Sequence, residues 1–191
     1  MNKLFKFFSV LGVIVVLGSV QRVRATQAAT PVEYRIILQR SLDDPSVEGF
    51  VVDHNCQLVD DFQICPAAGV ALHLIQPGAV DQVYLYLNPD KLFERFTGQL
   101  PYELAPNDTM ADVQRKLGHP KIPTIPLMGW EPGLPDEGAT PDHVHYWAIY
   151  KAYHLTVVFN TPTPDDPNAS IQMIVIDVNP TIPSWGKVYS L

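Results

Sequence analysis

The clearest pattern of apolar and polar positions predicts a helix from about Thr109 to Leu117. Met110, Val113 and Leu117 recur at the spacing of one helical face. Thr109 and Asp112 have the spacing of a capping box, and the Gly-His-Pro that follows Leu117 is typical of a helix end. About nine residues are too few for a helix that is stable alone in water. We therefore expect its apolar stripe to pack on a sheet.

Alternating apolar and polar positions predict two antiparallel hairpins. Residues 69–75 and 82–87 flank a Gln-Pro-Gly turn, and residues 144–150 and 155–160 flank Lys-Ala-Tyr. Residues 171–178 are almost continuously apolar, which is typical of a central strand covered on both faces. Weaker patterns predict three further elements: strands at 34–39 and 49–53, and one helical turn at 91–96.

This order of elements indicates an α+β fold, in which an antiparallel sheet of two hairpins and further strands is packed by one short capped helix at about 109–117. Residues 30–191 form a stretch of about 160 residues, which fits a single domain with its own core. Within it, residues 119–143 are rich in proline and glycine, and we expect a long loop there.

Residues 1–25 have the pattern of a secretory signal peptide. Lys3 and Lys6 precede an apolar run at 7–20, and small residues allow cleavage after Ala25 or Ala28. About 14 apolar residues are short for a membrane span, although an uncleaved signal anchor remains the alternative and would be the sole membrane contact. No cysteine lies near the cleavage site to accept a lipid. The expected location is therefore periplasmic or secreted.

Net charge narrows the range of partners. Removing residues 1–25 removes four basic side chains and no acidic one, which takes the formal net charge from −7 to −11. A chain this acidic does not suit nucleic acid or anionic lipid. It suits a solvated acidic surface or a basic partner. The sequence contains no phosphate loop and no nucleophile elbow, and we expect no cofactor.

The chain has two cysteines, Cys56 and Cys65. In an exported protein their expected state is one disulfide bond. The alternative is a nucleophilic cysteine, because His54 lies two residues before Cys56 and would share a face with it on a strand.

Three histidines at the second hairpin are weak candidates for a metal site. On a strand His143 and His145 share a face, and His154 could lie beside them from the neighbouring arm. Solvated histidines at a strand edge explain the same residues. The spacing matches no specific metal motif, so no metal site is assigned.

The long loop at 119–143 is the expected contact surface for a protein partner. Its apolar content is too high for a disordered linker, and its prolines restrict the backbone in advance. Met128, Trp130 and Leu134 are the candidate binding residues, with Trp130 as the anchor. The competing interpretation is an intramolecular lid that covers one face of the sheet.

Residues 100–178 resemble a module of small bacterial exported proteins. The shared pattern is Leu100-Pro101, then Thr109-Met110-Ala111-Asp112-Val113, then Leu117-Gly118-His119-Pro120, followed by antiparallel strands. It is similar to outer-membrane assembly lipoproteins of the BamE/SmpA type and to the β-lactamase-inhibitor-protein-like fold. Those proteins act by binding other proteins, and the resemblance carries over no binding residue.

These observations together predict an exported, non-enzymatic protein-interaction module of the bacterial envelope or extracellular space, with a protein partner. Two alternatives stay open. One is a metal-dependent enzyme or metal-binding protein that uses His143, His145 and His154. The other is a structural envelope protein.

Overall fold

The structure is a computed structural model, and it describes residues 36–75, 78–88, 92–120, 125–128, 144–161 and 166–178. The expected signal peptide, residues 1–25, lies outside these ranges. Within them, no helix is both long enough and apolar enough to cross a membrane.

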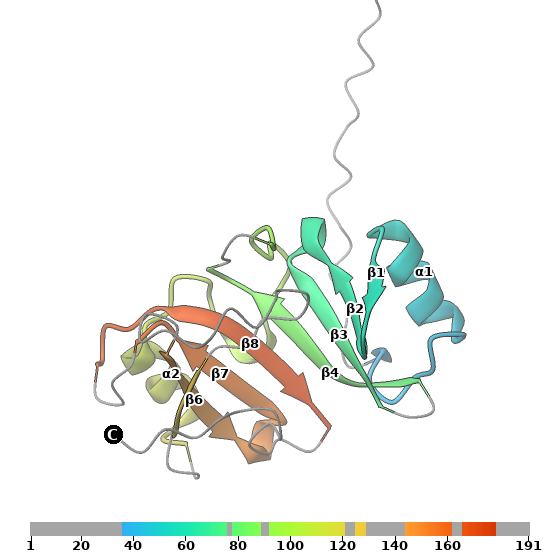
Figure 1. Ribbon diagram of the computed structural model, residues 1–191. Coiled ribbons are helices and arrows are strands. Elements are labelled where there is room, and N and C mark those ends of the chain that lie inside the picture. The colour runs from blue at the N-terminus through green and yellow to red at the C-terminus, as the bar shows by residue number, and fades with distance from the viewer. Residues whose placement is uncertain are drawn as a thin grey trace, which may run out of the picture.

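One antiparallel sheet of eight strands forms the framework (Figure 1). Its spatial order is β1-β2-β3-β4-β8-β7-β6-β5. The strands are β1 (Gln57–Val59), β2 (Phe62–Cys65), β3 (Val70–Ile75), β4 (Ala79–Tyr86), β5 (Ile125–Met128), β6 (Val144–Tyr150), β7 (Leu155–Phe159) and β8 (Ile171–Asp177). The helices in the described part of the chain are α1 (Pro45–Asp53) and α2 (Met110–Leu117), with short 3-10 turns η2 (Pro66–Ala68), η3 (Pro101–Glu103) and η5 (Lys151–Tyr153). The α+β prediction is confirmed.

Two meanders, β1–β4 and β5–β8, meet where β4 pairs with β8. Figure 1 shows α1 beside the first meander and α2 beside the second. Both predicted hairpins are present as β3–β4 and β6–β7. The predicted central strand is β8, which lies between β4 and β7 and has all seven residues buried.

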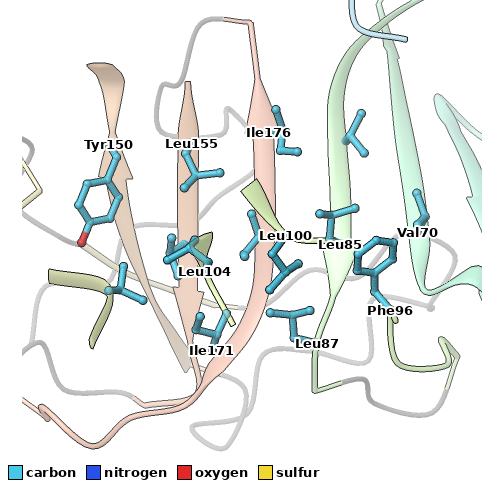
Figure 2. Close-up of a cluster of buried hydrophobic side chains, with 14 of the residues drawn as sticks. Val70, Leu85, Leu87, Phe96, Leu100, Leu104, Tyr150, Leu155, Ile171 and Ile176 are labelled. Atoms are coloured by element: carbon cyan, nitrogen blue, oxygen red, sulfur yellow. The ribbon is translucent and has the colours of Figure 1, made fainter. Parts of the chain in front are cut away.

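The helices and the loop before α2 cover one face of the sheet, called here the helix-covered face. Val47 and Phe50 of α1 and Met110, Val113 and Leu117 of α2 belong to the same buried cluster as the inward residues of β3, β4, β7 and β8. Figure 2 shows side chains of the loop among them, and these are Phe96, Leu100 and Leu104.

The opposite face of the sheet, called here the aromatic face, has its own buried cluster. It contains Phe62, Tyr84, Tyr86 and Trp147 together with smaller apolar side chains. Phe93 stacks on Tyr86, with ring centroids 3.9 Å apart and planes at 7°. Because both faces are buried, the strands between them are apolar on both sides, as the sequence of β8 predicts.

The predicted helix is α2, and its N-terminal capping box forms as expected. Thr109 Oγ1 accepts a hydrogen bond from the Asp112 amide (3.3 Å), and Asp112 Oδ2 accepts from the Thr109 amide (2.9 Å). Hydrogen bonds from Thr109 and then from Arg115 to the carboxylate lower the pKa of Asp112 to about 2. Gly118 ends the helix at φ 80° and ψ −176°, a positive φ outside the left-handed helical region. The Met110 amide donates to the Ala169 carbonyl (2.9 Å), which ties α2 to the segment before β8.

The predicted strand at 49–53 is wrong, because these residues belong to α1. Asp44 caps the helix by accepting from the Ser46 amide at 3.0 Å, and Pro45 occupies the first turn. This Asp-Pro-Ser start is a helix signal that outweighs the strand propensity of Phe-Val-Val. Val47 and Phe50 then fall on one buried helical face.

Three more predictions are corrected. Residues 36–39, the described part of the strand predicted at 34–39, form turns, and Gln39 has φ 61°. Residues 92–96, the described part of the turn predicted at 91–96, are not helical. Within the loop predicted at 119–143, β5 is a strand that pairs with β6. Its cross-strand partners are too far along the chain for a local pattern to predict.

Leu117→Ala should lower the free energy of unfolding by about 2–5 kcal/mol, because it leaves a cavity under the sheet where Leu117 is 8 % exposed. Urea unfolding followed by circular dichroism measures the change. Gln114→Ala on the same helix, at a position that is not buried, is the matched control. A loss for Leu117→Ala of less than about 0.5 kcal/mol, the range of ordinary surface substitutions, would show that the stripe is not core.

Candidate functional site

A pocket of about 380 Å³ lies where four segments of the chain meet. The segments are the stretch before α1, η3, the turn of the β6–β7 hairpin, and the end of β8. The lining residues are Leu38, Gln39, Pro101, Tyr102, Tyr153, His154, Ile176, Asp177 and Val178. We call this the tyrosine pocket. Its volume lies at the lower end of the range of ligand pockets, and its lining combines apolar side chains with a few polar ones.

Two tyrosines are fixed against each other in this pocket. The rings of Tyr102 and Tyr153 pack edge to face, with centroids 5.0 Å apart and planes at 71°. Tyr102 Oη donates to the backbone carbonyl of Tyr153 at 2.7 Å. Both side chains are partly exposed. The hydrogen bond and the ring contact therefore hold aromatic surface in a set position before any ligand arrives.

The backbone of the pocket is strained. In the part of the chain that the structure describes, three of the non-glycine residues with positive φ line the pocket: Gln39 (61°), Tyr102 (56°) and His154 (52°). Such a conformation is uncommon for a bulky side chain and costs about 1–3 kcal/mol at each residue. Backbone strain of this kind clusters at functional sites, so it marks the pocket as a candidate.

Helix α2 holds the strained η3 turn in place. Glu103, next to Tyr102, also has a positive φ of 59°. Lys116 Nζ donates to the Glu103 carbonyl at 2.8 Å and lies 2.7 Å from Asp108 Oδ2. The Asp108 carboxylate in turn accepts from the Ala105 amide at 2.7 Å. The capped helix therefore positions one wall of the pocket.

His154 has a defined orientation in the pocket. Its Nδ1 lies 2.8 Å from the Val178 carbonyl, and its own carbonyl accepts from the Asp177 amide at 3.1 Å. A carbonyl only accepts, so the proton of the neutral ring sits on Nδ1. The other ring nitrogen, Nε2, is then a hydrogen-bond acceptor.

The Asp177 side chain belongs to a polar network on the aromatic face, the face of the sheet opposite Ile176, Tyr102 and Tyr153. It is 6 % exposed, and its Oδ2 accepts from Gln82 Nε2 at 2.6 Å. Tyr84 Oη donates to Gln82 Oε1 at 2.5 Å. Burial, and then the carboxylates of Asp177, Asp81 and Asp61, raise the pKa of Tyr84. Tyr84 therefore stays neutral and acts as a donor.

His73 joins three segments of the first meander and was not singled out from the sequence. Its Nδ1 lies 2.6 Å from Asp81 Oδ1 on β4, and its Nε2 lies 3.2 Å from Asp61 Oδ2 in the β1–β2 turn. The hydrogen bond to Asp81 is the main cause that raises the pKa of His73, with Asp61 adding to it and burial opposing it. His73 lies on the face of β3 opposite that of Leu72. A histidine on that face of a predicted strand is the sequence signal that could have pointed to the cluster.

The β6–β7 register contradicts the expected histidine cluster. Tyr146 pairs with Phe159 and Tyr150 with Leu155, so His154 lies in the turn while His145 lies at the other end of β6. At about 3.4 Å per residue, about 17 Å of strand separates them. His143 lies outside the described residues. In the described part of the chain, no group of three histidine, cysteine or acidic side chains could hold a metal ion.

Cys56 and Cys65 form the predicted disulfide, with Cα atoms 4.2 Å apart. The bond links the segment after α1 to the end of β2. His54 is the C-cap of α1 and packs against the Phe50 ring at 4.4 Å, so it is not on a strand with Cys56. The nucleophilic cysteine is therefore wrong.

Of the three predicted partner-binding residues, the structure describes Met128 alone. Met128 is the last residue of β5 and pairs with Val144, at the end of β6 away from the pocket. Trp130 and Leu134 lie outside the described residues, and their role stays a prediction.

The chemistry available in the tyrosine pocket follows from its lining. Its described residues include no serine, threonine, cysteine or lysine that His154 could activate as a nucleophile. Asp177 is already hydrogen-bonded to Gln82.

Comparison of the chain with family models, curated proteins and solved structures finds no match. The candidate site therefore rests on the geometry described above.

The raised pKa of His73 predicts how stability depends on pH. The unfolded histidine keeps an ordinary pKa of about 6.5. The charged ring therefore contributes its full stabilisation below about pH 6.5, and this contribution is lost as the pH rises through the higher folded-state pKa. The difference in unfolding free energy between wild type and His73→Gln should be larger at about pH 5.5 than at about pH 8.5.

Urea unfolding at the two pH values measures this difference. His119→Gln, which changes an exposed histidine, is the matched control. A difference that stays constant or grows with pH would show that the contacts of His73 with Asp61 and Asp81 do not stabilise the fold through a charged ring.

Proposed function

We propose that this chain is an exported, non-enzymatic module that binds a protein partner through the tyrosine pocket. The observation that carries the proposal is the Tyr102–Tyr153 pair, which a hydrogen bond and an edge-to-face contact hold partly exposed on strained backbone. Tyrosine is enriched at protein interfaces because it presents a large amphipathic surface at low entropic cost.

Two further observations support export and binding. A disulfide bond persists in oxidising compartments and is rare in the cytosol, and this agrees with the signal pattern at residues 1–25. We propose a periplasmic or secreted location. The resemblance of residues 100–178 to envelope proteins that bind other proteins points the same way, and its helix is the element that holds η3.

Affinity capture from the envelope or medium of the producing cell tests the proposal. Tyr153→Ala should weaken partner binding by about 30-fold, which corresponds to the 2 kcal/mol expected of an interface hot spot. The substitution keeps the backbone carbonyl that accepts from Tyr102 Oη, so the η3 wall retains its hydrogen bond. Loss of the ring contact should cost only about 0.5–1.5 kcal/mol of stability.

Two variants serve as comparisons. Val52→Ala changes a side chain on α1 that is 70 % exposed and should leave capture unchanged. Trp130→Ala tests the loop predicted from the sequence. If capture survives Tyr153→Ala and fails in folded Trp130→Ala, the loop is the contact surface and the pocket proposal is wrong.

A further inference from the structure

We infer that the protonation of His73 regulates the tyrosine pocket through a bulge in β4. This inference rests on the proposed function and adds a control of the same site. It follows from the contacts of the His73 ring, from the position of Asp81 at the bulge, and from the hydrogen bonds that run from the bulge to the pocket lining.

Both ring nitrogens of His73 face carboxylate oxygens. Nδ1 lies 2.6 Å from Asp81 Oδ1, and Nε2 lies 3.2 Å from Asp61 Oδ2. An ionised carboxylate only accepts, so both contacts are hydrogen bonds only when the ring carries two protons and a positive charge. Loss of one proton leaves one carboxylate facing a lone pair and removes the charge that attracts both.

The surroundings of His73 favour the charged ring. The two carboxylates and that of Asp177 on β8 all act on the Tyr84 hydroxyl of β4, which places them in one acidic cluster. The strand β2 contributes the uncharged ring of Phe62, whose centroid lies 4.8 Å from that of the histidine ring. The hydrogen bond to Asp81 is the main cause that raises the pKa of His73. The proton on His73 therefore offsets the mutual repulsion of these acids.

Asp81 is the extra residue of a β-bulge. His73 of β3 pairs with Gln82 of β4. The next residue of β3, Leu74, pairs with Val80, which leaves Asp81 without a partner on β3. A bulge interrupts the ladder and re-aims a side chain, and bulges are common beside functional sites. The bulge is therefore the part of β4 that can change when the contact with His73 is lost.

Two backbone hydrogen bonds connect the bulge to the pocket lining. The Asp81 carbonyl accepts from the Val178 amide at 3.2 Å. The neighbouring Val80 carbonyl accepts from the Gln39 amide at 2.6 Å. Both Gln39 and Val178 line the pocket, and the Val178 carbonyl also orients His154 through Nδ1 at 2.8 Å. A change at the bulge therefore reaches two sides of the pocket.

The direction of the effect follows from these contacts. The charged ring holds the bulge, and with it the pocket lining, in the arrangement described above. As the pH rises through the folded-state pKa of His73, which lies above the ordinary value of about 6.5, the ring loses its proton and releases the bulge. A partner that binds the held arrangement therefore binds more tightly below this pH. By linkage, its binding raises the pKa of His73 further.

Nuclear magnetic resonance of the full chain as a function of pH provides the test. The ring carbon protons of His73 report its titration. The protection factor of the Val178 amide, corrected for the intrinsic pH dependence of exchange, reports the hydrogen bond to Asp81. It should fall by at least about threefold, the scale of one weakened hydrogen bond, with the midpoint of the His73 ring. The amides of Gln39 and His154 should shift with the same midpoint.

Three variants separate the bulge from other routes. His73→Gln removes the titrating ring and should abolish the change at Val178. Asp81→Ala keeps the backbone carbonyl that accepts from Val178, and should abolish the change while His73 still titrates. Asp61→Ala, the matched control, removes the other carboxylate and should move the midpoint downward while the change persists. A dispersed amide spectrum shows that each variant is folded.

Two results would overturn the inference. If the Val178 protection factor stays constant through the titration of His73, the bulge does not carry the change to the pocket. If the change persists with the same midpoint in His73→Gln, another group causes it. Either result leaves the proposed function standing, because partner capture with Tyr153→Ala tests binding at the pocket separately.

Discussion

The pairing of β4 with β8 is the interaction on which the rest of the structure depends. Its register runs from Gln82↔Asp177 to Tyr86↔Met173, and among the described strands it is the pairing that joins the two meanders. We call this β4–β8 pairing the seam. Because β8 is buried on both faces, the helix-covered cluster and the aromatic cluster both extend across it. Loss of the seam would divide both cores at once.

The tyrosine pocket lies at one end of the same seam. The end of β8 supplies Ile176, Asp177 and Val178, and the first pair of the seam places Gln82 against the Asp177 carboxylate. The walls come from elements that pack on β8 or lead into it. Their strained conformations persist because α2, the β6–β7 turn and β8 fix them from several directions. The fold therefore supplies the rigidity that a preformed binding site requires.

Local signals explain what could be predicted from the sequence. The capping box of α2, the alternation of β3, β4 and β7, and the apolar run of β8 each lie within one short segment. The helix α1 also had a local signal in Asp44-Pro45-Ser46, but the apolar residues after it were interpreted as a strand. A cap signal should therefore outweigh β-propensity over so short a run.

The candidate site could not be predicted in this way. Tyr102 and Tyr153 are 51 residues apart, and their contact depends on the placement of η3 by α2 and on the position of the β6–β7 turn. The histidine cluster failed for a related reason, because same-face spacing on a strand says nothing about the register of its neighbour. His145 and His154 became separated once Tyr150 paired with Leu155.

Native-state amide hydrogen exchange tests the central role of the β4–β8 seam most directly. If the seam makes one cooperative unit, the slowest amides of β3, β4, β7 and β8 should all exchange with the same free energy of opening, equal to that of global unfolding. The common value should fall in parallel across these four strands as urea is added. If amides of one meander open at a clearly lower free energy while the other stays protected, the two halves are separate units and this account is wrong.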